Sequence, residues 1–241
     1  NSDFIKFLEE KGFYVTKNSH SNYAQTSTSL ASTLNMKYLN YLSEAIENES
    51  KDHGILYQML DNNLVMRNFK SAGYQVYNIS SGVWNTGSID IADEHLCIKN
   101  QNIDYRTLYQ LKQTSILRAF DMLIKEPTSQ IFHQQHRNII LCQFDEITKI
   151  KQITEEPVFV FMHVITPHEP FVFGPNGEEV DYKYTLGPNV VTPFGSTSKF
   201  GLTPSEEIKA YRDQVIYVTK ILRQTIDKLL ENSDNPPIII I

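Results

Sequence analysis

Apolar residues recur along the chain with two spacings, one typical of helices and one typical of buried strands. The longest helical stripe covers 205–230, where the apolar positions are Ile208, Tyr211, Val215, Val218, Leu222, Ile226 and Leu229. Pro204, followed by the acidic residues 206–207 ahead of the first apolar position, is typical of a helix start. The nearly unbroken run 158–164, rich in β-branched and aromatic residues, predicts a central strand.

A helix that ends at a glycine and continues into a strand is predicted twice. Gly12 separates a helical pattern from a predicted strand at 13–16, and Gly73 separates the helix opened at 61–63 from a strand at 74–79. We interpret the two segments as αβ units of one sheet.

The remaining pattern completes an alternation of helices and strands. It predicts helices over 26–34, 104–124 and 129–150, a long loop over 171–204, and a buried strand that begins in the apolar run 236–241. Such an alternation predicts an α/β fold, with a mostly parallel central sheet flanked by helices on both faces.

Length and charge narrow the class of protein. The chain has 241 residues, which suits one large α/β domain or two small ones, and we expect a single domain over 1–241. Hydrophobic residues make up 41% of the chain, enough for a sizeable core. Its 22 basic and 28 acidic residues give a formal charge of −6, which argues against a nucleic-acid partner. No run of 18 apolar residues is present, so we expect this piece to be soluble. The chain starts without methionine and stops inside an apolar run, so we expect a fragment of a longer protein.

Cysteines and paired histidines are the usual first candidates for metal ligands. Cys97 and Cys142 lie among apolar residues, which favours two buried free thiols, although a disulfide would form readily in an extracytoplasmic domain. Their spacing makes no zinc site. His133 and His136 lie three residues apart on a predicted helix, and we interpret them as a solvated or half-buried face rather than a metal site.

The polar segment 21–32 is the first candidate for chemistry. It leads from a loop into a predicted helix, with Thr26 or Ser27 expected as the N-cap. A hydroxyl at a helix N-terminus can meet an anionic group, because the free backbone N–H groups and the helix dipole favour negative charge. A metal ion beside such a hydroxyl would make it a nucleophile. Local physics alone favours ordinary capping.

The second candidate is the segment 162–170, at the carboxyl end of the predicted central strand. Ligands of open α/β sheets bind outside those ends, and a histidine there can hold an oxyanion or protonate a leaving group. His163 and His168 are the residues concerned, and a loop histidine without a catalytic task is an equally open interpretation. Trp84 follows the strand at 74–79 and could line the same site, although packing is the more ordinary role.

Taken in order, these segments resemble the sulfatase and phospho-transfer branch of the alkaline phosphatase superfamily. Residues 26–36 resemble the sulfatase nucleophile signature and the threonine-centred motif of lipoteichoic-acid-synthase-like enzymes, and both place the nucleophile at Thr26. Residues 163–171 resemble the family's H-x-x-x-P-H-x-P-Y segment, whose second histidine, here His168, faces the sulfate or phosphate of the substrate. The long helix and the run 236–241 resemble the elements that lead into the family's Asp-His-Gly motif.

The resemblance implies an alkaline-phosphatase-like fold that is incomplete here, because the first strand and the Asp-His metal motif would lie outside the chain. It implies a divalent metal ion (Mn, Mg, Zn or Ca), with Thr26 as the ligand that the chain retains. Thr28 and Leu30 stand where sulfatases have proline and arginine, and a threonine cannot become formylglycine. The resemblance therefore implies phosphoryl chemistry, in which Thr26 forms a phospho-threonine and His168 stabilises the oxygens, with His163 and Trp84 beside the substrate.

Three classes of function stay open. The first is a metal-dependent hydrolase or phospho-transferase of phosphate or sulfate esters in envelope lipid or glycan modification. Its parent would be anchored in a bacterial inner membrane, with this domain periplasmic or extracellular and a phospholipid or glycan as substrate. The second is a soluble sulfuric ester hydrolase, and the third is a catalytically inactive binding module with a sulfatase fold. In each case we expect residues 1–241 alone to turn over little.

Overall fold

The computed structural model describes seven stretches of the chain, namely residues 2–45, 53–83, 86–98, 127–150, 154–180, 202–231 and 235–241. The chain divides into two compact units, and each is described by itself. The first comprises Asn1–Leu96 with Lys149–His163, and the second Cys97–Thr148 with Val164–Ile241. The expectation of a single domain over 1–241 stays a prediction.

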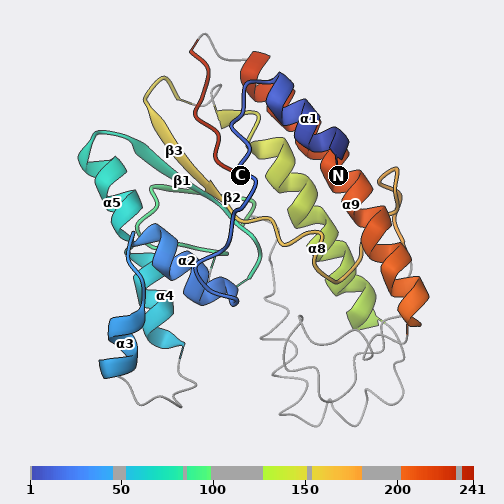
Figure 1. The fold of residues 1–241 in the computed structure, drawn as a ribbon, viewed down its shortest axis with the longest axis horizontal. Coiled ribbons are helices and arrows are strands. Elements are labelled where there is room, and N and C mark those ends of the chain that lie inside the picture. The colour runs from blue at the N-terminus through green and yellow to red at the C-terminus, as the bar shows by residue number, and fades with distance from the viewer. Residues whose placement is uncertain are drawn as a thin grey trace. The chain divides into compact units, whose positions relative to one another are not determined.

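A parallel sheet organises the first unit (Figure 1). Its strands are β1 (Gln75–Ile79), β2 (Glu94–Leu96) and β3 (Val158–Met162), in the order β2-β1-β3, with both neighbours parallel to β1. The predicted α/β class with a parallel sheet is therefore confirmed. The short β2 was not predicted, because its sequence Glu-His-Leu carries neither a β-branched residue nor an apolar run.

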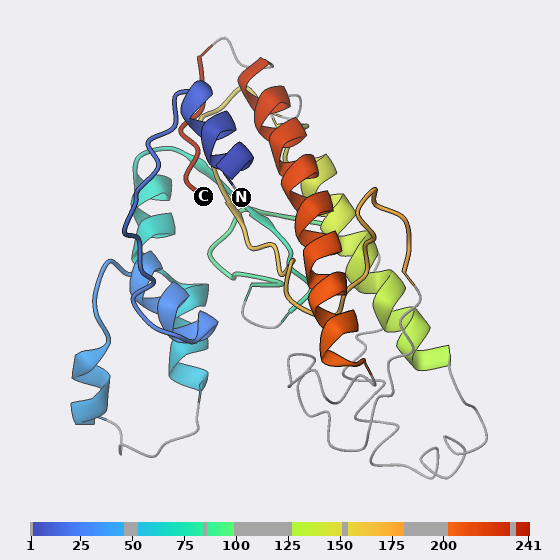
Figure 2. The same cartoon turned by 45° about the vertical axis from the view of Figure 1, so that its right-hand side comes forward.

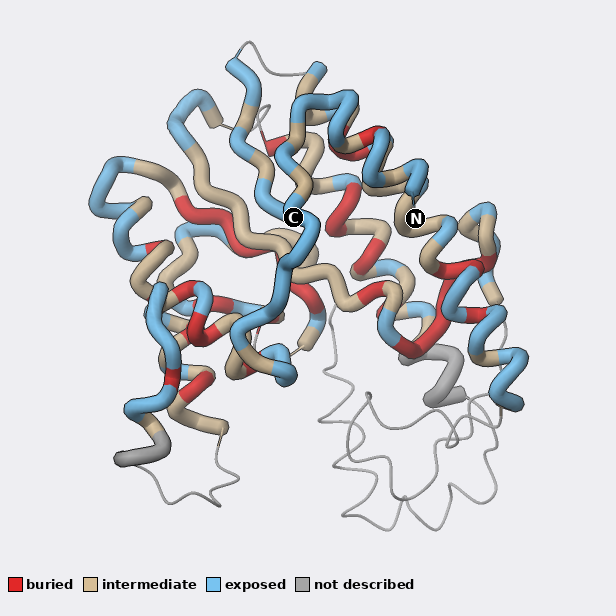
Figure 3. Tube along the Cα trace, viewed as in Figure 1, coloured by how far each residue is buried: buried red, intermediate tan, exposed pale blue. Residues whose placement is uncertain are grey.

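The middle strand of the sheet, β1, is the one whose side chains are buried. β1 is buried from Val76 to Ile79 (Figure 3). Val76 packs with Met66 of α5 (Leu64–Ser71) and with Ile89, and the rings of Phe69 and Phe159 stack at 4.4 Å between centroids. One face of the sheet is thus covered by α5. Gly73, with φ of +85°, makes the turn between α5 and β1 as the sequence predicted.

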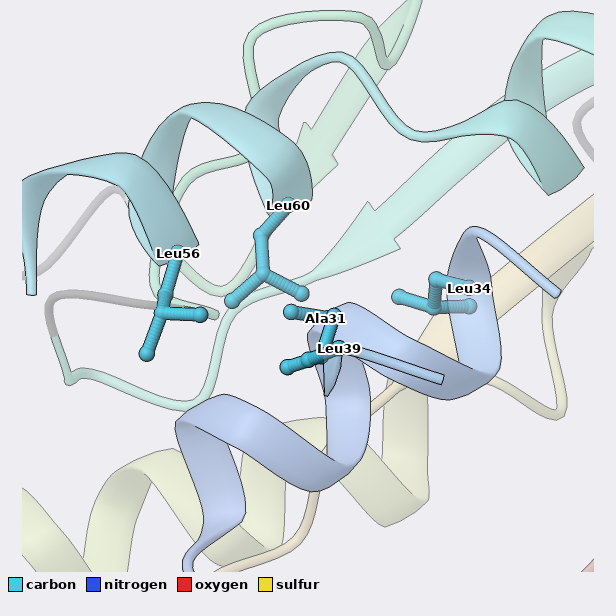
Figure 4. Close-up of a cluster of buried hydrophobic side chains, with 5 residues drawn as sticks. All are labelled: Ala31, Leu34, Leu39, Leu56 and Leu60. Atoms are coloured by element: carbon cyan, nitrogen blue, oxygen red, sulfur yellow. The ribbon is translucent and has the colours of Figure 1, made fainter. Parts of the chain in front are cut away.

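The first unit also contains the helices α1 (Ser2–Glu10), α2 (Thr26–Leu34), α3 (Asn40–Ala45) and α4 (Gly54–Asp61). A second hydrophobic cluster joins α2, α3 and α4. Leu56 and Leu60 of α4 meet α2 and the residues after it in a buried cluster with Ala31, Leu34 and Leu39 (Figure 4). This cluster fixes α2 through its apolar side.

The second unit contains two long helices that run side by side in both views (Figures 1 and 2). They are α8 (Pro127–Glu146) and α9 (Pro204–Glu231). The bounds of α9 closely match the prediction, but Ile208 and Tyr211 of its predicted apolar stripe are exposed. Ile140 and Phe144 of α8 pack with Val172 and Phe173, and the inner side of α9 covers the cluster with Tyr217, Val218, Ile221 and Leu222. None of the described helices is long and apolar enough to cross a lipid bilayer.

A disulfide between Cys97 and Cys142 ties the start of the second unit to α8. The prediction of two free thiols is therefore wrong. The sequence could not pair residues 45 positions apart, whereas the fold brings their Cα atoms within 5.9 Å.

Two predicted strands are absent from the stretches that the structure describes. Residues 13–16 and 236–241 pair with no strand among the described residues, and the side chains of Tyr14, Ile238 and Ile240 are 90%, 93% and 92% exposed. An apolar run becomes a strand only where a neighbour accepts its backbone hydrogen bonds. The helix predicted over 104–124, and most of the loop predicted over 171–204, lie outside the described residues.

Candidate functional site

Thr26 is the first residue of α2, and Gln25 occupies the N-cap position with a β-region backbone (φ −95°, ψ 141°). The expectation that Thr26 or Ser27 caps the helix is therefore wrong. Thr26 is exposed, and its hydroxyl has no hydrogen-bond partner within the described stretches. Nearby, the hydroxyl of Thr28 donates to the Gln25 carbonyl oxygen at 2.9 Å. The Thr26 hydroxyl thus lies at the helix end where backbone N–H groups lack intrahelical acceptors.

The loop before Thr26 is held against its own helix. The Asn22 amide donates to the Ser32 hydroxyl oxygen at 3.0 Å, and the Tyr23 hydroxyl accepts from the backbone N–H of Leu39 at 2.6 Å. Together with burial of Ala31, these contacts set where the helix begins. The position of Thr26 is therefore fixed by the packing of α2 and the loop before it, and not by a capping side chain.

His163 follows β3 and joins a chain of buried hydroxyls. Its Nδ1 lies 2.8 Å from Oγ1 of Thr86, and that oxygen lies 2.7 Å from Oγ of Ser81, which follows β1. Ser81 and Thr86 are 2% and 0% exposed. Burial lowers the pKa of His163, which favours the neutral imidazole. Sequence reasoning missed both hydroxyls, although they flank Trp84 in the sequence; Trp84 itself lies outside the described residues.

His168 belongs to the second unit and is exposed. Its Nδ1 lies 2.9 Å from the backbone oxygen of Glu169. A carbonyl oxygen can only accept, so this contact assigns a proton to Nδ1. The Thr166–Pro167 and Glu169–Pro170 peptide bonds on either side are both cis.

Burial shifts the pKa values of two titratable side chains near His168, namely Glu169 and His136. Burial, and secondarily the charge of Glu207, raises the pKa of Glu169 to about 7. Oε2 of Glu169 is buried and has no hydrogen-bond partner among the described residues. On α8, burial, followed by the charges of His133 and His168, lowers the pKa of His136 to about 3. His136 is therefore a buried neutral histidine and not part of a solvated face, whereas His133 is half-buried as predicted.

The described residues offer little to a metal ion. Among them, no group of three or more His, Cys, Asp or Glu side chains is arranged to hold one. Thr26 is the one metal ligand that the sequence analysis predicted in this chain. Its hydroxyl fits as a single oxygen donor, since Thr26 is exposed and its hydroxyl makes no competing hydrogen bond within the described stretches.

A family model described as Sulfatase matches residues 2–241, which is essentially the whole chain. The chain belongs to the sulfatase family. No curated protein and no solved structure matches it. Membership confirms the resemblance to the sulfatase-like members of the alkaline phosphatase superfamily, although the branch is not fixed by it. Sulfatases act on sulfate or phosphate esters and generally use divalent metal ions.

Within this sulfatase-family chain, the predicted site residues fall on both units. Thr26, the first residue of α2, and His163, the residue after β3, lie in the first unit. His168 lies in the second unit. The structure adds Ser81 and Thr86 as the partners of His163. The catalytic and substrate-binding roles assigned to Thr26, His163, His168 and Trp84 stay predictions.

Proposed function

We propose that the natural protein is a metal-dependent hydrolase or phospho-transferase that cleaves phosphate esters with Thr26 as nucleophile. One observation carries the proposal. Thr26 presents an exposed hydroxyl, without a hydrogen bond to the described residues, at the first position of a helix in a sulfatase-family chain. A capping hydroxyl would be engaged with the backbone, so capping no longer accounts for this threonine.

The proposed reaction has two displacements. In the first, Oγ1 of Thr26 forms a bond to phosphorus while the bond from phosphorus to the leaving oxygen breaks, and the hydroxyl proton passes to water. In the second, an oxygen of water or of an acceptor hydroxyl forms a bond to phosphorus while the bond from phosphorus to Oγ1 breaks. The attacking oxygen loses its proton to water, and Oγ1 regains a proton from water, which restores Thr26. His168, with Nε2 protonated, donates a hydrogen bond from that nitrogen to a phosphoryl or leaving oxygen, because its Nδ1 is engaged by the Glu169 carbonyl.

A divalent ion, when bound, would supply positive charge beside the hydroxyl and so increase its nucleophilicity. Thr26 would be its oxygen ligand from this chain. The free N–H groups at the start of α2 would add a favourable field for the anionic ester.

Substrate and compartment form the finer part of the proposal. The disulfide between Cys97 and Cys142 supports a domain that works outside the cytoplasm, since disulfides persist in oxidising compartments. We therefore propose that the domain works on the periplasmic or extracellular side. We also propose, from the resemblance alone, that its parent is anchored in a bacterial inner membrane. Esters of envelope lipids or glycans, such as the phosphoglycerol or phosphoethanolamine headgroups of phospholipids, are the proposed donors.

The test compares Thr26→Ala with Thr33→Ala in the natural, full-length protein. Both threonines are exposed residues of α2, so the second variant controls for loss of a hydroxyl on the same helix. We expect Thr26→Ala to abolish turnover of a phospholipid donor, and Thr33→Ala to retain it. Mass spectrometry after incubation with the donor should find a phosphorylated peptide that contains Thr26.

Other outcomes point to other classes. Full activity of Thr26→Ala would remove this residue from the mechanism. Turnover of a sulfate ester but of no phosphate ester would make the protein a sulfuric ester hydrolase, and turnover of neither would leave a binding module.

A further inference from the structure

One buried side chain of α9 holds the segment that carries His168. Gln214 is 0% exposed. Its Oε1 accepts from the backbone N–H of Val172 at 2.8 Å and of Phe173 at 3.3 Å. Its Nε2 donates to the carbonyl oxygens of Pro167 and His168, each at 3.2 Å. The four contacts lie within the second unit and reach residues on both sides of Pro170.

The chemistry of these contacts requires an amide. A glutamine side chain offers two N–H donors and one oxygen with two lone pairs, and here both donors and both lone pairs are used. A glutamate would keep the acceptors but would set an oxygen against two carbonyl oxygens. A methionine of similar length would leave four backbone groups without these partners in a buried site, which is costly.

A second helix holds the same segment farther along. Nη1 and Nη2 of Arg137, on α8, donate to the carbonyl oxygens of Val172 at 2.9 Å and Gly177 at 2.6 Å. The guanidinium also lies over the ring of Phe173, 4.6 Å from its centroid. Arg137 and Gln214 therefore both hold the backbone after His168. Of these two side chains, only Gln214 binds the backbone of His168 itself.

We propose that Gln214 is a positioning residue for His168. The inference rests on the proposed function, in which His168 donates to an oxygen of the ester. Gln214 binds the carbonyl of His168, and the carbonyl of Glu169 binds Nδ1 of the ring, so the main chain and the imidazole are oriented together. Gln214 touches no reacting atom and acts through His168.

The first experiment is a double-mutant cycle on phosphate-ester turnover by the natural protein. We expect Gln214→Met to lower kcat by about 10- to 100-fold through misplacement of His168. The matched control is Gln224→Met, an exposed glutamine on the same helix, which should stay within about twofold of wild type. In a His168→Ala background, Gln214→Met should cost less than about threefold, because its effect passes through the missing ring. An equal loss in both backgrounds overturns the proposal.

The second experiment does not depend on activity. Hydrogen exchange in a peptide spanning 167–173 should be faster in Gln214→Met than in wild type or Gln224→Met, because Val172 and Phe173 lose their acceptor. Unchanged exchange overturns the proposal even if the natural protein shows no phosphate-ester activity, a result that would separately remove the proposed function. If Gln214→Met fails to fold, Gln214→Glu replaces it in the turnover experiment, and hydrogen exchange then checks only that the segment keeps its fold. This variant should keep Val172 and Phe173 protected yet lower kcat, and unchanged kcat would overturn the proposal.

Discussion

Two adjacent residues, His168 and Glu169, occupy opposite environments. His168 is exposed, whereas Glu169 is buried, and Oε2 of Glu169 lacks a hydrogen-bond partner in the described part of the chain. The Thr166 hydroxyl, two residues before His168, is likewise buried without one there. Burial of a carboxyl group without a donor favours its neutral form. The segment therefore carries a proton near neutral pH that an exposed glutamate would not hold.

This proton makes stability depend on pH. Burial first, and the charge of Glu207 second, raises the pKa of Glu169 from 4.5 to about 7. The folded state binds the proton more tightly than the unfolded chain, so the contribution to stability is complete below pH 4.5 and is lost as the pH rises to about 7. We predict that Glu169→Gln, which is neutral throughout, removes this loss. Relative to wild type, the variant should gain on the order of 2 kcal/mol between about pH 4 and pH 8.

Chemical denaturation at both pH values checks the prediction. Glu179→Gln, an exposed glutamate of the same segment, is the control and should follow the wild-type curve. If wild type and Glu169→Gln lose stability equally over this range, then the buried carboxyl is not the group that binds the proton.

At the scale of elements, helix α5 begins at an asparagine that the fold has buried. The Oδ1 of Asn63 accepts from the backbone N–H of Met66 at 2.9 Å, and its Nδ2 donates to the Leu60 carbonyl at 2.8 Å. Asn63 is 0% exposed. The Asn63 side chain therefore caps α5 and also joins it to α4. Its two partners, Leu60 and Met66, belong to the two hydrophobic clusters of the first unit.

We predict that Asn63→Ala lowers the free energy of unfolding by about 2 kcal/mol, because it removes an N-cap and leaves a buried backbone group without its partner. Asn62→Ala, at the exposed neighbouring residue, should cost less than about 1 kcal/mol. Urea denaturation of the two variants measures both values. Equal losses would mean that the cap contributes nothing beyond the ordinary cost of substitution at this turn.

The sequence predicted those elements whose signal is local. The stripe at 205–230 became α9, Gly73 ended α5, and the apolar run at 158–164 contained β3. The errors arose where hydrogen bonding to a neighbouring strand decides whether a segment becomes a strand. Residues 13–16 have the composition of a strand but no partner among the described residues, whereas the polar β2 is a strand because β1 lies beside it.

The site follows the same division. Thr26 was proposed as a site residue from its place in a local motif, and its role stays a prediction. Gln214 was not, because its partners lie 41 to 47 residues away in the sequence and a glutamine on an amphipathic helix carries no signal. Ser81 and Thr86 were missed for a related reason. They are linked to the candidate site only through their contact with His163, which lies 77 residues after Thr86 in the sequence.

At the scale of the whole molecule, the disulfide is the covalent feature that the sequence left open. We predict that replacing Cys97 and Cys142 together by alanine lowers the free energy of unfolding by about 2 to 4 kcal/mol, since the bond closes a long loop in the unfolded chain. The separation of 45 residues places it among the longer loops. Thermal denaturation with and without reductant measures the effect.

Reductant should lower the melting temperature of wild type and leave that of the double variant unchanged. If reductant changes neither protein, the two sulfurs are not joined in solution.

The same bond has a consequence for how the protein is produced. A chain made in the reducing cytoplasm of an expression host would leave the ribosome with two thiols, and would have to find its fold without the constraint between Cys97 and Cys142. Export through a secretion signal, or a host strain with an oxidising cytoplasm, supplies the missing step during synthesis. Yield of soluble protein from the two routes would therefore report on the compartment in which this domain evolved to fold.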